Sequence, residues 1–397
     1  MSKYRFAERV RPITGSAIRE IFNMLADPNI ISFAGGNPSP ASFPSAKIKQ
    51  IVIELMELNG EKILQYGSTE GWGPLRETAM AINSKKGINS ALSNIQILTG
   101  SSQGIELSAK LFLNEGDTLL LEDPTFLGAT QTFRTYKAEP IGVDTDAEGM
   151  ILSDLEEKIK IFDPKLIYTI PNFQNPSGNT TSLARRKGVF ALADKYKVVI
   201  VEDDPYGELR YEGDDIPCIK TFDSNGERVI LLNSFSKTIS PGLRVGYATA
   251  DPEIIRKMAV IKQGIDIHTT NLSQAIVDAF YRKGLYYPHV QRICEFYRVQ
   301  RDAMLDAIAK YFPKNIKYTR PEGGLFIWIE LSKNIQVLPI FKEAVARGVA
   351  FVPGEHFYAD LSGKNTLRLN FSMPSVEQID IGCKILGELL HETLADC

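Results

Sequence analysis

Two hydrophobic periodicities alternate along the middle of the chain, and they indicate strands and helices in turn. Between about residue 95 and residue 250, short apolar runs are separated by stretches with helical spacing, such as Ile105–Leu113 and Leu183–Tyr196. The apolar runs predict strands at Ile95–Thr99, Thr118–Leu121, Pro140–Val143, Leu166–Ile170, Val198–Val201, Val229–Leu232 and Arg244–Ala250. Because such alternation builds a sheet with helices on both faces, the pattern predicts an α/β fold with a mostly parallel seven-stranded sheet.

The pattern changes after about residue 280, where strands and helices no longer alternate regularly. A long charged helix is predicted over Tyr287–Phe312 and a shorter one over Leu338–Ala346. Strands are predicted over Gly323–Leu331 and Leu367–Ser372. These elements indicate a second, smaller α+β domain.

The first 45 residues are turn-rich and are expected to fold with this smaller domain. Ser16–Leu25 has apolar residues at helical spacing, and Ile30–Pro38 is a short extended piece broken by two glycines. The expected organisation is an N-terminal arm at 1–45 that is part of the small domain, a large domain at 46–280 and a small C-terminal domain at 281–397.

Composition narrows the partners that this chain can be expected to have. The 397 residues are 44% hydrophobic and 23% charged, and a net charge of −3 gives no electrostatic attraction for nucleic acid or an anionic membrane. The four cysteines form no Cys-x-x-Cys pair and the four histidines lie far apart, so neither a metal site nor a disulfide framework is indicated. We expect a soluble cytoplasmic protein with reduced thiols.

The most informative chemistry follows the apolar run Val229–Leu232. A polar turn there carries Ser234, Ser236 and Lys237, and Arg244 stands seven residues beyond the lysine. Open α/β sheets keep their ligands at the carboxyl ends of their strands. A lysine in that place can form a Schiff base with a carbonyl cofactor, and two hydroxyls with an arginine suit a phosphate. Pyridoxal phosphate carries both groups, although a solvated surface loop would have the same composition.

The string from Ser234 to Tyr247 resembles the cofactor-lysine segment of class I/II aminotransferases, which are fold-type I pyridoxal-phosphate enzymes. The resemblance extends from Arg19 to Arg368, so it covers nearly the whole chain. It implies the fold-type I architecture and pyridoxal 5'-phosphate as cofactor. It also implies ping-pong transfer of an amino group between an L-amino acid and a 2-oxo acid, with Lys237 as the cofactor lysine and proton carrier.

Two further segments match the phosphate end of such a site. Ser101 and Ser102 lie between a strand and a helix, where they are either simple N-caps or part of an anion site. The resemblance assigns them to the phosphate cradle with Ser234, Ser236 and Arg244. It also implies a homodimer in which Tyr66, on the glycine-rich loop Gln65–Arg76, reaches the cofactor phosphate of the neighbouring subunit.

Four residues match the positions around the pyridine ring. The resemblance assigns Phe126 to stacking on the ring, although relatives often carry tyrosine there and a core position is the plain alternative. Asn175 and Tyr206 are assigned to the ring oxygen, and Asn175 also to the substrate carboxylate. Asp203 is assigned to the ring nitrogen, whose proton turns the ring into an electron sink. Lys237, Asp203 and Tyr206 are thus the implied catalytic residues.

The remaining matches concern the substrate. Arg368 lies within an apolar strand, where it either forms a salt bridge or, by resemblance, clamps the α-carboxylate through its planar guanidinium. The segments around Arg19 and Gly36 are similar to the N-terminal arm of the α-aminoadipate/kynurenine subgroup. This similarity implies that Gly36 contacts the substrate and that Arg19 can meet a distal carboxylate. Asn37 departs from the apolar residue that is common there.

Two other functions are compatible with these residues. A β-eliminating lyase would use the same cofactor on the same fold, but it would release ammonia and need no 2-oxo acid. A ligand-sensing transcription regulator would join such a body to a DNA-binding domain, and this chain shows no basic N-terminal domain of that kind. An aminotransferase acting on aromatic, branched or 2-aminoadipate-type donors, with glutamate, is therefore the leading expectation.

Overall fold

A computed structural model describes residues 4–10 and 29–395, and its largest feature is the predicted mostly parallel sheet. Eight strands pair in the order β2-β9-β8-β7-β6-β3-β4-β5. Their bounds are β2 Ile95–Leu98, β3 Thr118–Asp123, β4 Glu139–Asp146, β5 Gly149–Met150, β6 Leu166–Thr169, β7 Val199–Asp204, β8 Val229–Ser234 and β9 Gly246–Thr249. The strands from β8 to β4 run parallel, whereas β9 is antiparallel to β2 and β8.

The large sheet has eight strands, one more than the seven expected from the sequence. All seven expected strands are present, and the additional one is β5, which is only two residues long and pairs antiparallel with the end of β4. A two-residue strand carries no readable alternation, because periodicity needs at least four residues to show. The eighth strand lies at the edge of the sheet and changes nothing at its centre.

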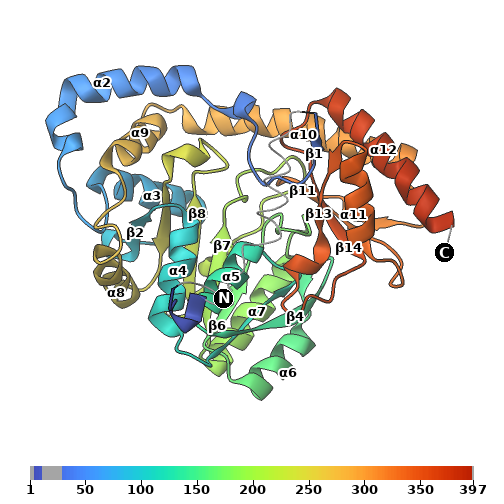
Figure 1. The fold of residues 1–397 in the computed structure, drawn as a ribbon. Helices are drawn as coiled ribbons and strands as arrows, with labels where there is room; N and C mark the ends of the chain where they lie inside the picture. The colour runs from blue at the N-terminus through green and yellow to red at the C-terminus, as the bar shows by residue number, and fades with distance from the viewer. Residues whose placement is uncertain (1–3, 11–28, 396–397) are drawn as a thin grey trace.

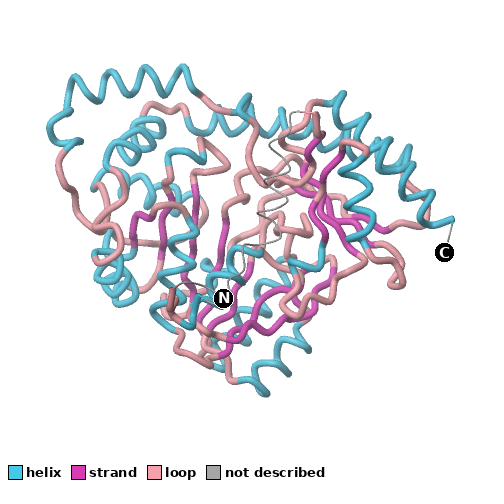
Figure 2. Tube along the Cα trace, in the orientation of Figure 1, coloured by secondary structure: helices cyan, strands magenta, loops and turns pink. Residues whose placement is uncertain are grey.

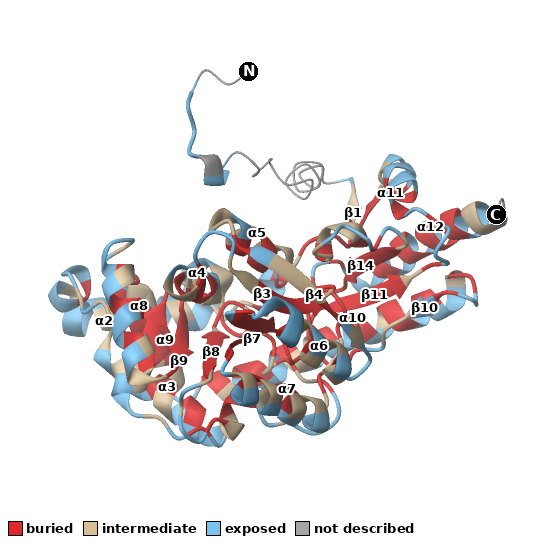
Figure 3. Ribbon diagram, turned by 90° about the horizontal axis from the view of Figure 1, so that it is seen from below, coloured by how far each residue is buried: buried red, intermediate tan, exposed pale blue. Residues whose placement is uncertain are grey.

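Helices cover both faces of this sheet, and Figure 3 shows the buried strands enclosed by helices whose outer sides are exposed. Apolar residues of α4 and α5 pack with one set of strand residues, and those of α6 and α7 pack with the other set. The helix that was expected at Leu183–Tyr196 is α7 itself. The helices of this region are α2 Ser45–Leu64, α3 Gly73–Lys85, α4 Ser101–Phe112, α5 Leu127–Thr135, α6 Leu152–Phe162, α7 Leu183–Tyr196, α8 Pro252–Gln263 and α9 Asn271–Arg282.

Alternation along β7 sends neighbouring side chains to opposite faces of the sheet. Val201 belongs to the apolar cluster that contains α4 and α5, and Ile200 belongs to the cluster that contains α6 and α7. Since side chains alternate with a period of two, Asp203 shares its face with Val201 and Asp204 shares its face with Ile200. All six residues of β7 are buried, so both carboxylates are held inside the protein.

The second part of the chain forms a smaller antiparallel sheet with the order β10-β11-β14-β13, which Figure 2 shows as a separate group of strands. The long helix α10 connects the two parts and lies along one side of the molecule (Figure 1). The elements are α10 Tyr286–Tyr311, β10 Lys317–Tyr318, β11 Phe326–Glu330, α11 Val337–Ala346, β12 Val349–Ala350, β13 Val352–Pro353, β14 Thr366–Asn370 and α12 Val376–Ala395.

The N-terminal segment joins this smaller part through backbone pairing. Strand β1, Ile31–Ser32, pairs parallel with β12, and the Asn370 amide donates to the Phe33 carbonyl at 2.8 Å. The helix expected at Ser16–Leu25 lies outside the described residues. Within 4–10 and 29–395, no helix is long and apolar enough to cross a membrane.

Candidate active site

A cavity of about 410 Å³ lies at the carboxyl ends of β6, β7 and β8, between the large sheet and the smaller one. Its lining combines strand ends, the N-terminus of α4 and the Arg368 side chain from β14. Twelve of the fourteen residues expected from the sequence line it, namely Gly36, Ser101, Ser102, Phe126, Asn175, Asp203, Tyr206, Ser234, Ser236, Lys237, Arg244 and Arg368.

Lys237 stands in the turn after β8, with its amine inside the cavity. The Nζ atom donates to the Gly36 carbonyl at 2.7 Å. Burial lowers the pKa of this amine to about 8, and the positive charges of Arg368 and Arg244 act in the same direction. Because the neutral amine is the nucleophilic and basic form, this environment makes Lys237 reactive near neutral pH.

One end of the cavity is rich in groups that suit a phosphate. The Arg244 guanidinium donates to the Ser236 hydroxyl at 3.5 Å and to the Thr99 carbonyl at 3.1 Å, and the Ser234 and Ser236 hydroxyls lie 3.0 Å apart. The first turn of α4 faces the same space with Ser101 and Ser102. Helix N-termini with free backbone N–H groups and a guanidinium together bind phosphate well.

The N-cap of α4 is Gly100, so neither serine caps the helix with its side chain. Gly100 has φ +82°, and a Cβ atom there would lie 2.4 Å from Nη2 of Arg244. Glycine at this position thus allows both the turn and the close approach of the guanidinium. Of the two possibilities left open for Ser101 and Ser102, side-chain capping is wrong.

Asp203 presents one free oxygen to the cavity. Its Oδ2 accepts a hydrogen bond from the Tyr168 hydroxyl at 2.9 Å, whereas Oδ1 is buried and has no partner among the described residues. Burial raises the pKa of Asp203 to about 7, against the opposing effects of the Tyr168 and Ser101 hydroxyls. A buried carboxylate with an unpartnered oxygen is costly, so it favours a cationic N–H group as its partner.

Arg368 lines the cavity from β14 of the smaller sheet. Its guanidinium donates to the Asn175 side-chain oxygen at 2.8 Å and to the Ala34 carbonyl at 2.7 Å, while its Nε has no partner among the described residues. The guanidinium also lies over the rings of Phe326 and Phe357. Burial lowers its pKa to about 10, so it stays positively charged at neutral pH and can bind a carboxylate.

Aromatic side chains also line the cavity. Phe126 comes directly before α5 and lies half-buried at the cavity, and Tyr206 is buried two residues after β7. The ring of Tyr206 meets that of Phe326 edge to face, with centroids 5.8 Å apart. Burial raises the pKa of Tyr206 above its ordinary value, so its hydroxyl remains a hydrogen-bond donor.

The structure adds residues that the sequence did not single out. Tyr168 lies within the apolar strand β6. A buried tyrosine needs a hydrogen-bond partner for its hydroxyl, and this requirement could have indicated from the sequence that Tyr168 contacts a polar group. Gln131 and Phe357 line the cavity without any local motif. Gln174 binds Glu122 and the Pro124 carbonyl at 3.1 and 2.7 Å, and so it supports the turn that carries Asn175.

Two expected residues do not appear in the cavity. Tyr66 is 76% exposed and lies edge-on to the ring of His268, away from the lining residues. Arg19 lies outside the described residues. No group of histidine, cysteine, aspartate and glutamate within the described part of the chain has the arrangement of a metal site.

The residues present fit pyridoxal phosphate at three independent points. The unpartnered Asp203 oxygen suits a protonated ring nitrogen, the Ser–Arg244–helix end suits a phosphate, and the Lys237 amine of lowered pKa suits a carbonyl. Fold and cavity together define an enzyme of the fold-type I pyridoxal-phosphate class.

Comparison with known proteins defines the family. A family model described as aminotransferase class I and II matches residues 28–386, and the chain belongs to this family. Aromatic-amino-acid aminotransferase 1 of Thermococcus litoralis is 41% identical, over 98% of this chain and 94% of that protein. The 2-aminoadipate transaminase of Thermus thermophilus is 38% identical, over 98% and 97% of the two chains.

A solved structure is similar throughout. The kynurenine aminotransferase of Pyrococcus horikoshii, solved in complex with PMP, superposes with a TM-score of 0.94 at 42% identity, covering 98% of this chain and 97% of that one. Class I and II aminotransferases use pyridoxal phosphate, so the expected cofactor and the expected transamination of amino acids are confirmed. Among the functions left open by the sequence, the protein is therefore an aminotransferase.

Proposed function

We propose that the cavity around Lys237 is the transamination site and that the enzyme acts on aromatic, branched or 2-aminoadipate-type donors, with glutamate as the common partner. The observation that carries this proposal is the convergence of Lys237, the free oxygen of Asp203, Arg244 and Arg368 on one cavity of about 410 Å³. The named activities of the relatives support the donor class.

Each residue has a distinct task in this proposal. When bound, pyridoxal phosphate supplies the carbonyl that takes up the amino group and a ring that delocalises charge. Ser101, Ser102, Ser234, Ser236 and Arg244 would hold its phosphate, and Phe126 would pack on its ring. These contacts fix the orientation of the reacting groups and leave the chemistry to the residues around the amine.

The proton transfers fall to the residues at the centre of the cavity. As a neutral amine, Lys237 would take the proton from the substrate Cα and deliver it to the cofactor carbon that receives the amino group, and its pKa of about 8 favours this neutral form. The Asp203 carboxylate would keep a proton on the ring nitrogen, and Asn175 and Tyr206 would donate to the ring oxygen. Arg368 holds the α-carboxylate so that the Cα–H bond faces Lys237.

The surroundings of the substrate side chain bear on the donor class. Apolar and amide surface for the substrate side chain comes from Leu127, Gln131 and Phe357. The cationic residues among the described lining are Lys237, Arg244 and Arg368. Each of these three is already assigned to the cofactor, the proton transfer or the α-carboxylate. An aromatic or branched side chain fits such a wall without further charge. Recognition of a distal carboxylate would fall to Arg19, as the resemblance of the N-terminal arm suggests.

A half-reaction experiment tests this function directly. The purified holoenzyme is mixed with phenylalanine, leucine, 2-aminoadipate or glutamate, in the absence of any 2-oxo acid. We expect the visible cofactor band to bleach with stoichiometric release of the matching 2-oxo acid. Release of ammonia in place of that transfer would contradict the proposal and indicate a lyase.

We further propose that the active form is a homodimer in which Tyr66 serves the neighbouring site. Tyr66 is exposed and lies beside an apolar surface formed by Leu64 of the preceding helix, and the nearby loop exposes Ile265 and Ile267. Exposed apolar side chains gathered in this way favour a second copy as partner. Light scattering of the wild type tests whether the protein is a homodimer. The cofactor affinity of Tyr66→Phe tests whether Tyr66 serves the neighbouring site.

We place the enzyme in the cytoplasm. The support is the free thiols of Cys218 and Cys383, which are buried and unpaired, as expected in a reducing compartment. Detection of the native protein in cell fractions tests this assignment.

A further inference from the structure

Two consecutive acids at the end of β7, Asp203 and Asp204, line two different cavities. Asp203 faces the active-site cavity, and Asp204 faces a second cavity of about 690 Å³ on the other side of the sheet. Both are buried, at 3% and 5% exposure. Consecutive residues in a strand are only about 3.8 Å apart at Cα, so the two charges act on each other whatever their directions.

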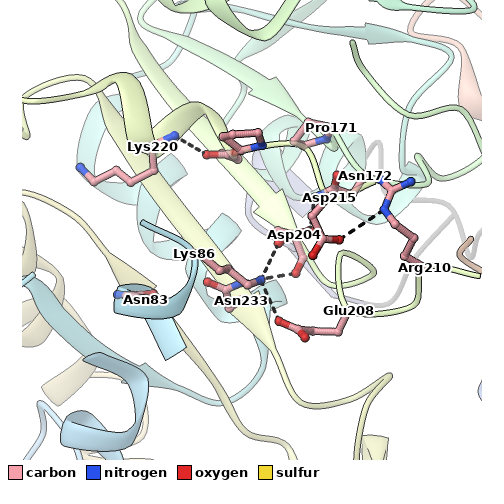
Figure 4. Close-up of polar contacts among 12 residues, drawn as sticks. Asn83, Lys86, Pro171, Asn172, Asp204, Glu208, Arg210, Asp215, Lys220 and Asn233 are labelled. Carbon is pink, nitrogen blue, oxygen red and sulfur yellow. Dashed lines mark hydrogen bonds and ion pairs between the residues drawn. The ribbon is translucent and has the colours of Figure 1, made fainter. Parts of the chain in front are cut away.

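Lys86, which directly follows α3, approaches Asp204 in this second cavity, and Figure 4 shows the arrangement. Its Nζ lies 3.2 Å from Oδ2 of Asp204 and 3.1 Å from Oε1 of Glu208. The Lys86 side chain is 22% exposed, whereas that of Asp204 is 2% exposed. The lysine therefore connects a buried carboxylate to the edge of an open cavity.

The other oxygen of Asp204 is bound by the loop that follows β6. The Asn172 amide donates to Oδ1 at 2.8 Å, and Arg186 in turn donates to the Asn172 oxygen at 2.6 Å. A Cβ atom on Gly207 would lie 2.4 Å from Oδ1, so the chain leaves room for this carboxylate. Asn172 belongs to the same loop as Asn175, which lines the active site.

The charge balance of this cluster depends on Lys86. Burial would raise the pKa of Asp204, but the charge of Lys86 and the Asn172 hydrogen bond hold it below the ordinary value. Burial would lower the pKa of Lys86, but Asp204 and Glu208 hold it well above its ordinary value. The charge of Asp204 in turn adds to the burial that raises the pKa of Asp203. Removing one partner from such a pair leaves an uncompensated buried charge.

We propose that Lys86 is a positioning residue for the transaminase site: by neutralising Asp204 from the far face of the sheet, it allows Asp203 to carry its negative charge beside the cofactor ring. This inference rests on the proposed role of Asp203. Lys86 lines the second cavity and a small one of about 20 Å³ beside it, and it is not among the residues that line the active-site cavity.

The test is a double-mutant cycle on the full-length holoenzyme. Equilibrium dialysis against pyridoxal phosphate measures cofactor affinity, and steady-state kinetics measures kcat and KM for the preferred donor. For Lys86→Met we expect cofactor affinity and kcat to fall roughly tenfold, which corresponds to about 1.4 kcal/mol, with KM little changed. Lys86→Arg should keep wild-type values, and Lys86→Met combined with Asp204→Asn should recover them.

Lys85 provides the matched control. It lines the same cavity one residue earlier, but its ammonium lies 3.8 Å over the ring of Tyr287. Lys85→Met should leave cofactor affinity unchanged. If the double variant binds the cofactor as weakly as Lys86→Met does, then Lys86 acts through packing and the inference is overturned. If Lys86→Met does not fold, a folded double variant of wild-type affinity supports the inference, and a double variant that also fails contradicts it.

A reference variant separates this inference from the proposed function. Asp203→Asn should lose cofactor affinity and turnover whether or not Lys86 matters. If Asp203→Asn loses neither, then the proposed role of Asp203 is wrong. If Asp203→Asn loses both and Lys86→Met loses neither, only the role of Lys86 is wrong.

Discussion

The Tyr168 hydroxyl donates to Oδ2 of Asp203 at 2.9 Å, while Oδ1 of the same carboxylate has no partner among the described residues. This hydrogen bond fixes the plane of the carboxylate and leaves a single oxygen for a partner in the cavity. Burial and the charge of Asp203 raise the pKa of Tyr168 well above its ordinary value, so the hydroxyl keeps its proton. Tyr168 therefore remains a donor throughout the physiological pH range.

Tyr168→Phe should retain the fold but weaken the site. A hydrogen bond to a charged group contributes about 1.5–3 kcal/mol, so we expect cofactor affinity to fall by about tenfold or more. Tyr196→Phe is the control, because Tyr196 also donates to a carboxylate, Glu156, at 2.7 Å, but outside the cavity. Equal affinities for the two variants would show that the Tyr168 contact has no part in cofactor binding.

Lys237→Ala should abolish turnover while cofactor still binds without a covalent bond. Loss of the amine removes both the attachment point and the proton carrier, so we expect kcat to fall by about three orders of magnitude or more. Single-turnover spectra of the reconstituted variant measure the loss. Transamination retained at a rate near that of the wild type would disprove the assignment.

Arg368→Lys should raise KM for amino donors and 2-oxo acids alike. Lysine preserves the charge, but it cannot make the planar two-point contact with a carboxylate, so we expect an increase of about tenfold. Initial rates with varied donor and with varied acceptor give the two KM values. An increase for only one of the two substrates would be inconsistent with α-carboxylate recognition, since both carry that group.

Cofactor capture by the apoenzyme should accelerate as pH rises through about 8. The pKa of the Lys237 amine is lowered to about 8 by burial and by Arg368 and Arg244, and only the neutral amine attacks a carbonyl. Stopped-flow absorbance after addition of pyridoxal phosphate measures the rate. Arg368→Met removes one positive charge, so its inflection should move to higher pH, and an unmoved inflection would mean that this charge does not act on Lys237.

Glu122→Gln should change how stability depends on pH. Burial raises the pKa of Glu122 to about 7, so the folded protein binds an extra proton between about pH 4.5 and 7. The free energy of unfolding therefore contains a contribution from this group that is present at low pH and lost as pH rises through 7. Thermal unfolding at pH 5.5 and pH 8 should show a smaller difference for the variant than for the wild type.

Much of the candidate site was predictable because its chemistry follows strand ends. Asp203 lies at the end of β7, and Lys237 and Asn175 follow β8 and β6 within a few residues; parallel strands bring such ends together. The same reasoning predicted the order of strands and helices between residues 95 and 250.

Other contacts of the site could not be predicted from the sequence. The Gly36 carbonyl binds Lys237 across 201 positions of sequence, and any residue has a carbonyl. Lys86 and Asp204 come together from elements more than a hundred residues apart, and no local pattern marks either as a partner. Contacts of this kind depend on tertiary packing and not on periodicity or turn chemistry.

The alternation at the end of β7 has a consequence for how this gene can change length. Deleting or inserting one residue between Val199 and Asp203 would shift the two acids by one position against the apolar residues before them. Either Asp203 and Asp204 would then exchange faces, or the preceding apolar residues would change layer. A substitution in β7 alters the side chain at one position, whereas a single-codon indel would change the face of every strand residue on one side of it. We therefore expect variation in chain length among functional variants of this enzyme to avoid Val199–Asp204 and to occur in its loops.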